Sequence, residues 1–289
     1  MSHTKHQRPN TKIWCLAFGV LAGRRWKSLG RFNPLALALV VCLPAVCLAQ
    51  PKNPAPPPAP LERAEGEKVA HALIANLLSQ KPEQNLTNTA LVKIRGTDKK
   101  WREQPITFAV VVTPTNYLNI YETTSTNGAS AHTLTIVHSD DRANQYWLSD
   151  SAGGAARKLG ENELMKPFAD SDFWIADLGV EFLHWPDQRV LKKEMRSSVS
   201  CDVLQSLNPH AMAGGYSRVV SWIGTSHPDE FVLVHADGYD EHGKLMRWFE
   251  PKSLEKVNGA YQLESMEMRN AQTGTRTIIE FNLEKHPAP

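Results

Sequence analysis

The chain has 289 residues, with 32 Lys and Arg against 30 Asp and Glu, and a formal charge of +2 at pH 7. The charge is unevenly distributed, because the first 50 residues hold seven Lys and Arg and no acid. The remainder has 25 basic against 30 acidic residues, a formal charge of −5, and contains no basic block. This composition argues against nucleic acid as a partner, since phosphate backbones are bound by clustered Lys and Arg.

Residues 1–49 have the order of a secretory signal peptide: basic residues, then an apolar run over 35–48, then small residues up to Ala49. The apolar run is shorter than the ~20 residues that cross a bilayer as a helix. We therefore expect export to the periplasm and cleavage after Ala49. The alternative is an uncleaved N-terminal anchor that leaves the rest of the chain facing the periplasm.

The cysteine count agrees with an oxidising compartment. Cys15, Cys42 and Cys47 would be removed with the signal peptide. Only Cys201 would then remain, so no disulfide within the mature chain is expected.

The segment that follows predicts a linker and then a helix. Residues 50–60 are rich in proline, which is typical of an extended polyproline linker. Residues 61–79 place apolar side chains at helical spacing among charged ones, and Pro82 ends the pattern. Residues 61–289 are long enough to bury one large core, so we expect a single domain there.

Beyond residue 86 the pattern has the period of strands. Short runs rich in Thr, Val, Ile and aromatic residues alternate with turn sequences such as Asn127-Gly128, Asp240 to Gly243, Asn258-Gly259 and Thr273-Gly274. About a dozen antiparallel strands are predicted, which indicates a large curved sheet or a barrel. The predicted strands are 86–95, 107–112, 117–123, 133–139, 144–148, 189–197, 201–207, 216–223, 231–236, 245–249, 261–269 and 275–283.

A middle segment, residues 167–185, interrupts this rhythm with an unusual number of aromatic residues. Asp170, Ser171 and Asp172 are good helix-capping residues, so a short helix is expected after them. The strand 216–223 carries apolar bulk on both faces, which predicts that the N-terminal helix and the middle segment cover it. The expected fold is mainly β, with a curved antiparallel sheet that forms an incomplete (half) β-barrel closed by an N-terminal helix and a middle helical lid.

From residue 145 to residue 283 the order of short motifs resembles the LolA-like outer-membrane lipoprotein-sorting proteins. The resemblance is one of pattern over about half the chain. Its motifs are Tyr146-Trp147-Leu148, Ser171-Asp172-Phe173, Asp177-Leu178, Cys201 to Leu204 with Pro209, Tyr216-Ser217-Arg218, Trp222-Ile223, Tyr239-Asp240, Gly243-Lys244-Leu245, Met268-Arg269-Asn270 and Gly274 to Thr277.

The resemblance implies an incomplete antiparallel barrel whose apolar cavity shields acyl chains in the periplasm. A cavity of this kind needs apolar and aromatic lining rather than covalent chemistry, since each buried methylene contributes about 0.8 kcal/mol. Each candidate could equally be part of a solid core, because aromatic residues are usually buried. The candidate lipid-binding residues of the cavity or lid are Trp147, Phe173, Trp174, Leu178, Phe182, Trp185, Trp222 and Phe281.

Catalysis and metal binding have weaker support. Cys201 could be a nucleophile, but it opens an apolar strand without a fixed spacing to a histidine. No nucleophile elbow or phosphate-binding loop is present in the sequence. The groups around His235 with Asp237 and around His138 with Asp140 are explained by turns and strand ends. We therefore expect no enzyme activity, no cofactor and no metal.

Two functions remain. The first is a periplasmic carrier, expected to be a monomer, that binds lipoprotein acyl chains or another lipid and exchanges them with inner- and outer-membrane acceptor proteins. The second is a sensor or regulatory module that binds a lipid-like signal and a membrane partner. The fold cannot separate them, because function depends on the site rather than on the scaffold.

Overall fold

The computed structural model describes residues 60–124, 131–139, 142–150, 154–227, 230–257 and 260–283. The expected signal peptide, the linker up to residue 59 and the turns at Asn127-Gly128 and Asn258-Gly259 lie outside these residues, as does Asp140. Within the described ranges, no helix is both long and apolar enough to cross a membrane.

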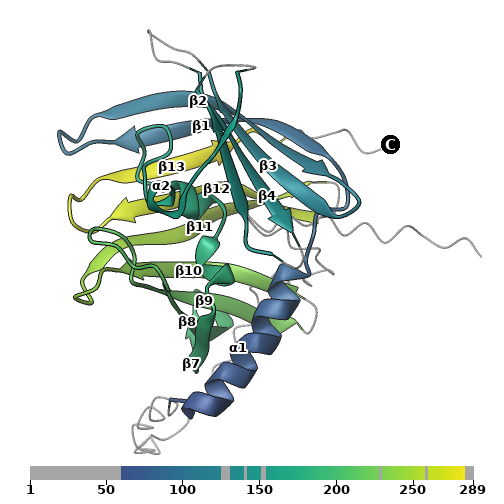
Figure 1. Cartoon of the computed structure of the whole chain (residues 1–289), viewed down its shortest axis with the longest axis vertical. Helices are drawn as coiled ribbons and strands as arrows, with labels where there is room; N and C mark the ends of the chain where they lie inside the picture. The colour runs from purple at the N-terminus through teal and green to yellow at the C-terminus, as the bar shows by residue number, and fades with distance from the viewer. Residues whose placement is uncertain are drawn as a thin grey trace, which may run out of the picture.

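One antiparallel sheet of thirteen strands dominates the molecule, and it curls without closing into a barrel (Figure 1). The strand order is β6-β5-β4-β3-β2-β1-β13-β12-β11-β10-β9-β8-β7, so the first and last strands in sequence meet at its centre. The strands are β1 (Leu86–Arg95), β2 (Trp101–Val112), β3 (Asn116–Thr123), β4 (Thr133–Ser139), β5 (Gln145–Ser149), β6 (Arg157–Lys158), β7 (Asp187–Arg196), β8 (Val199–Leu207), β9 (Arg218–His227), β10 (Glu230–Tyr239), β11 (Leu245–Val257), β12 (Ala260–Asn270) and β13 (Arg276–Phe281).

Period-two alternation gives the sheet an inner and an outer face. In β13, Thr277, Ile279 and Phe281 are buried on the inner face, whereas the residues between them are half-buried. The same alternation in β1 to β5 continues the inner face across the sheet. The predicted mainly β fold and its half-barrel form are confirmed.

The helix α1 (Arg63–Leu78) packs against β7 and β10 with Ala70, Leu73 and Leu77 in the main core. Its approach to β7 is close at Gly66, where an added Cβ would lie 2.5 Å from the backbone oxygen of Val190. The main-chain N–H of Leu61 also donates to the oxygen of Leu191 over 2.8 Å. The helix predicted over residues 61–79 therefore exists and covers the inner face of one wing of the sheet.

Residues 159–186, between β6 and β7, form what we call the lid segment (Figure 1). It contains three single-turn helices, α2 (Glu161–Leu164), α3 (Ile175–Leu178) and the 3-10 helix η1 (Glu181–His184). The middle segment is therefore mostly irregular, with short helical turns. The predicted capping of the short helix by residues 170–172 is wrong. At the start of α3, the Trp174 N–H donates to the Asp177 carboxylate over 2.7 Å.

The expectation that helices cover both faces of β9 is wrong. Val219 and Ile223 belong to the main core on the inner face. Val220 and Trp222 belong to a separate small cluster with Cys201 and Val203 on the outer face. There the apolar side chains are covered by long side chains of neighbouring strands, such as Arg196 above the Trp222 ring at 4.3 Å, and not by a helix.

Candidate functional site

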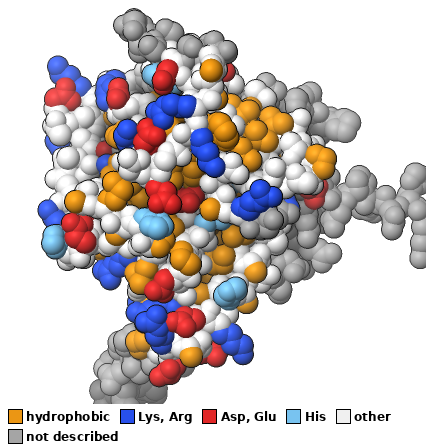
Figure 2. Space-filling view, viewed as in Figure 1, with side chains coloured by type: hydrophobic (Ala, Val, Ile, Leu, Met, Phe, Trp, Pro, Cys, Tyr) orange, Lys and Arg blue, Asp and Glu red, His pale blue; other side chains and the backbone are white. Residues whose placement is uncertain are grey.

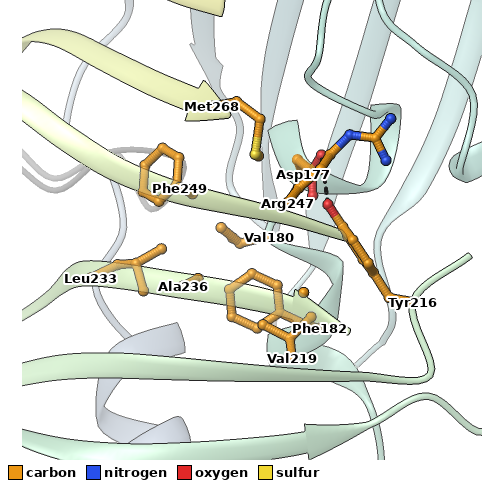
Figure 3. Close-up of a pocket in the computed structure, with 11 residues that line it drawn as sticks. Asp177, Val180, Phe182, Tyr216, Val219, Leu233, Ala236, Arg247, Phe249 and Met268 are labelled. Carbon is orange, nitrogen blue, oxygen red and sulfur yellow. Dashed lines mark hydrogen bonds between the residues drawn. The ribbon is translucent and has the colours of Figure 1, made fainter. Parts of the chain in front are cut away.

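The inner face of the sheet and the lid segment enclose a small apolar cavity (Figure 3). Its volume is about 20 Å³, which is enough for one water molecule. Ligand-binding pockets for larger molecules measure about 300–1,000 Å³, so this cavity has no room for an acyl chain. The cavity is lined by Asp177, Val180, Phe182, Tyr216, Val219, Leu233, Ala236, Gly238, Arg247, Phe249 and Met268.

The lid segment fills the space that a ligand of the sheet would occupy. Phe173 and Leu178 are almost completely buried, at 1% and 0% exposure. The Phe173 ring packs edge-on against Phe249 with 6.4 Å between ring centroids. Leu183 and Phe168 join the same core. The lid segment is therefore an apolar plug that belongs to the chain itself.

Three carboxylates, Asp172, Asp177 and Glu181, fasten this plug to different parts of the sheet, and we call them the anchor carboxylates. Asp172 binds the centre of the sheet. It accepts hydrogen bonds from the hydroxyls of Thr275 (2.6 Å) and Thr277 (3.0 Å), while its own N–H donates to the Thr277 hydroxyl over 2.9 Å. The middle of the lid segment is thereby held at β13.

Asp177 fastens the lid segment near β9 and β11. Its carboxylate accepts from the Tyr216 hydroxyl over 3.5 Å, in addition to the Trp174 N–H (Figure 3). Burial raises the pKa of Asp177 to about 6, against the opposing effect of the nearby Arg247. The Arg247 guanidinium lies 3.6 Å from the centroid of the Trp174 ring, which also packs on Tyr216 at 4.5 Å.

Glu181 fastens the lid segment to β5 on the opposite wing. Its carboxylate accepts from the Tyr146 hydroxyl over 2.7 Å and from the Asn144 amide over 3.2 Å. The same amide donates to the Gly179 oxygen over 2.8 Å. Burial raises the pKa of Glu181 to about 7, although both hydrogen bonds oppose the rise.

A buried histidine, His138, and a half-buried one, His184, lie beside this third anchor. His138 stacks on Tyr117 with 4.4 Å between ring centroids, and its Nε2 is 3.1 Å from the Asn119 amide nitrogen. Burial, and then the neighbouring His184, lower the pKa of His138 to about 3. Burial lowers the pKa of His184 to about 4. Both histidines are therefore neutral at physiological pH.

Six of the eight predicted lipid-binding residues lie on the inner side of the sheet. Phe173, Trp174, Leu178 and Phe182 belong to the plug, and Phe182 also lines the cavity. Phe281 lies on the sheet itself, with its ring 5.5 Å from that of Phe108. Trp185 is buried as well, but it faces a groove beside α1 rather than the cavity.

The structure does not bring the other two residues, Trp147 and Trp222, to this site. Trp147 is paired with Thr135, one residue out of phase with the buried Tyr146, so it lies half-buried on the outer face. Trp222 belongs to the outer cluster, where its indole N–H donates to Glu194. Neither contributes to an inner cavity.

Two open grooves flank the plug. One, of about 480 Å³, lies between the β1–β2 hairpin and the lid segment and includes Arg102, His132, Phe168 and Ile175 in its walls. The other, of about 770 Å³, lies between α1 and the end of the lid segment and includes His71, Arg142 and Trp185. The first reaches Ile94 and Leu148 on the inner face, so it leads from the surface towards the core.

The residues considered for catalysis or metal binding do not assemble a site. Cys201 is fully buried in the outer cluster, and burial raises its pKa. His235 Nε2 lies 2.8 Å from the Asp237 carboxylate. Among the described residues there is no group of three His, Cys, Asp or Glu side chains suited to a metal ion.

Sequence reasoning missed the polar contacts that hold the plug. The sequence pattern predicts Asp172 as a helix cap and does not bring Glu181, Tyr146 and Arg247 together. A usable signal existed, because residues 167–185 carry acids at 170, 172, 177 and 181 inside an otherwise apolar stretch. Acids in a buried segment require hydrogen-bond partners.

Comparisons with known proteins place the chain in a family. A family model described as "Uncharacterized protein"-like matches residues 119–285, more than half of the chain, so the chain belongs to that family. The solved structures below show that its fold is LolA-like. No curated protein sequence matches the chain.

Three solved structures share the fold. A DUF1329 family protein from Desulfovibrio piger has a TM-score of 0.61 at 16% identity, covering 75% of this chain and 91% of that one. A putative outer membrane lipoprotein-sorting protein domain from Vibrio parahaemolyticus has a TM-score of 0.60 at 17% identity, covering 76% and 91%. A LolA superfamily protein from Nitrosomonas europaea has a TM-score of 0.54 at 13% identity, covering 76% and 94%. At these identities the likeness concerns the fold alone.

Proposed function

We propose that the protein is a periplasmic carrier that binds the acyl chains of lipoproteins, or of another amphiphile, within the curled sheet. The observation that carries the proposal is the apolar plug, which occupies the inner face but is fastened by a few discrete polar contacts. Displacing the plug would expose an apolar concave surface without disturbing the strand pairing. The LolA-like fold and the lipoprotein-sorting relative support the proposal.

When an acyl chain replaces the plug, the apolar burial gained by the chain is similar to the burial lost by the lid residues. This balance suits a carrier. An acyl chain gains about 0.8 kcal/mol for each methylene that it buries. The displaced lid residues, including Phe173, Trp174 and Leu178, lose burial of a similar kind. A ligand that replaces one apolar surface by another binds with moderate affinity and can be released to an acceptor.

Arg247 supplies a group for the polar end of such a ligand. It is 9% exposed, lines the inner cavity, and its Nε has no hydrogen-bond partner in the described part of the chain. When the lid segment moves, its guanidinium would lose the Trp174 ring and become available to a carboxylate or phosphate. We propose no covalent chemistry, no cofactor and no metal.

Native mass spectrometry of the chain from Gln50 to Pro289, purified from a bacterial periplasm, tests the proposal. A lipid-sized excess over the sequence mass that disappears under denaturing conditions would support binding and would identify the ligand class. A bare mass, with no uptake of the fluorescent fatty acid cis-parinaric acid on titration, would contradict it.

The second candidate is a sensor that uses the same lid movement as a signal. The small closed cavity favours it as much as it favours a carrier, because a displaceable plug also changes the surface offered to a membrane partner. The two functions differ in the acceptor step. A carrier transfers bound parinaric acid when acceptor vesicles or proteins are added, whereas a sensor keeps its ligand and forms a stable complex with its partner.

A further inference from the structure

The β1–β2 hairpin ends in basic side chains that have no acidic partners. Arg95 ends β1, Lys99 and Lys100 lie in the turn, and Arg102 is the second residue of β2. In the parts of the chain that the structure describes, none of the four forms an ion pair. Arg95 donates to the Lys99 oxygen over 3.5 Å and Arg102 to the Asp170 oxygen over 3.0 Å. The acids nearby in sequence are Asp98, which caps the turn by accepting from the Lys100 N–H, and Glu103.

The strand register extends this basic character across the neighbouring hairpin. Arg276 of β13 pairs directly with Arg95 of β1, and Arg269 of β12 pairs with Arg276. Like charges opposite each other destabilise a sheet. A buried acid, Glu267, contacts two of these three arginines, at 2.8 Å from Arg269 and 3.5 Å from Arg276. We call these six residues, Arg95, Lys99, Lys100, Arg102, Arg269 and Arg276, the basic edge.

An exposed tryptophan stands in the middle of the basic edge. Trp101 is 44% exposed and pairs with Arg95 in the register, while the Arg276 guanidinium lies 4.8 Å from the centroid of its ring. Large exposed aromatic residues surrounded by Lys and Arg are typical of the membrane–water interface, where the ring sits among the headgroups. Figure 2 shows Lys and Arg side chains, with some acids, along the left edge where Figure 1 draws the β1–β2 loop.

The basic edge also adjoins the groove that leads from the surface towards the core. Arg102 and the two residues after it form one wall of the 480 Å³ groove, and Phe168 and Asp170 of the lid segment form another. At its bottom the groove reaches apolar side chains of the inner face, among them Ile94. If the charged side chains of the basic edge bind lipid headgroups, the groove therefore lies against the membrane surface.

We propose that the basic edge docks the protein on a membrane surface rich in anionic phospholipid, with the groove facing the bilayer. Lys and Arg near such a surface are attracted to its negative potential, and the indole of Trp101 would enter the headgroup layer. This docking deepens the proposed carrier function, and its biological purpose rests on that function. The docking itself depends mainly on Lys99, Lys100 and Trp101, which take no part in the plug, whereas Arg102 also donates to the Asp170 oxygen of the lid segment.

Sedimentation with vesicles tests the docking. The chain from Gln50 to Pro289, which contains every described residue, should bind vesicles of phosphatidylcholine with phosphatidylglycerol and should not bind phosphatidylcholine alone. Binding should weaken as salt rises, because charges at a surface are screened beyond about 10 Å at 0.1 M salt. Lys99→Ala with Lys100→Ala should lower the partition coefficient roughly thirtyfold, since each basic residue near the surface contributes about a fivefold factor.

A matched control removes the same charge elsewhere. Lys68 of α1 and Lys158 of β6 are both exposed, so Lys68→Ala with Lys158→Ala changes the net charge equally. This double variant should bind as the parent does. Trp101→Ala should also weaken binding, whereas Met212→Ala, which truncates another exposed apolar residue, should not. Equal binding to both vesicle types, or equal losses in the two lysine pairs, would overturn the proposal.

Uptake of cis-parinaric acid separates this inference from the carrier function. The Lys99→Ala, Lys100→Ala variant should take up the probe with the parent's affinity while losing vesicle binding. Vesicle binding without any uptake by the parent would reject carriage and keep the docking surface. Uptake without anion-dependent vesicle binding would reject the docking surface and keep carriage.

Discussion

The hydroxyl of Thr277 joins the lid segment to the centre of the sheet, so removing it tests whether the lid segment opens. Thr277→Val keeps a β-branched side chain but removes one hydrogen bond to the Asp172 carboxylate and leaves the Asp172 N–H without its acceptor. The first loss costs about 1.5–3 kcal/mol and the second about 1–3 kcal/mol in the closed form. In an open form both groups of Asp172 are hydrated, so the open form is not penalised.

The expected result is a protein that is less stable but binds amphiphiles more tightly. If the closed form loses about 3 kcal/mol, the open population rises up to ~100-fold, and the apparent dissociation constant for cis-parinaric acid falls by the same factor until the open form predominates. Fluorescence titration measures this apparent dissociation constant. Thr135→Val, on the outer face of β4, is the matched control and should leave the affinity unchanged. Unchanged affinity in a folded Thr277→Val variant would refute an opening lid.

Three further predictions concern stability and reactivity. The raised pKa of Glu181, about 7, means that the folded protein binds this proton more tightly than the unfolded chain, so its contribution is fully present below pH 4.5 and is lost as the pH rises through 7. Glu181→Gln should therefore gain up to about 3 kcal/mol over the parent between pH 4.5 and 8 in urea unfolding, and parallel pH profiles would contradict the assignment. Gly66→Ala should lower the melting temperature although alanine favours helix by about 1 kcal/mol, because the new methyl meets the Val190 backbone; Ala64→Gly, on the exposed face, should cost only that propensity. Cys201 should resist iodoacetamide in the native protein and react after unfolding, and rapid native labelling would contradict its burial.

The sheet was predictable from the sequence because its signal is local. The alternation of Thr277, Ile279 and Phe281 follows from the two-residue period of a strand, and this face is buried as expected. The pairing of β1 with β13 was not predictable in this way. It joins residues 191 positions apart, Ala90 and Phe281, and no local pattern encodes that distance.

The inner and outer positions of the tryptophans were harder to predict than the strands. Trp147 and Trp222 are large and apolar, which suggests an inner cavity, but the face of a strand residue is set by its phase relative to its neighbours. Tyr146 and Ile223 hold the inner positions in their strands, so the adjacent tryptophans point outward. Arg196 and Glu194 make the outer position of Trp222 stable by covering its ring and accepting from its N–H.

The anchor carboxylates explain why polar contacts, rather than apolar ones, control such a site. Exchange of the plug for an acyl chain replaces buried apolar surface by buried apolar surface, so the hydrophobic terms largely cancel. The hydrogen bonds of Asp172, Asp177 and Glu181 do not cancel, because a lipid tail offers nothing in their place. Each anchor binds a different part of the sheet, so losing one should loosen the lid segment locally before it unfolds the protein. The balance between closed and open forms therefore depends on a few contacts worth about 1–3 kcal/mol each, which is the range over which a membrane surface or an acceptor protein can shift it.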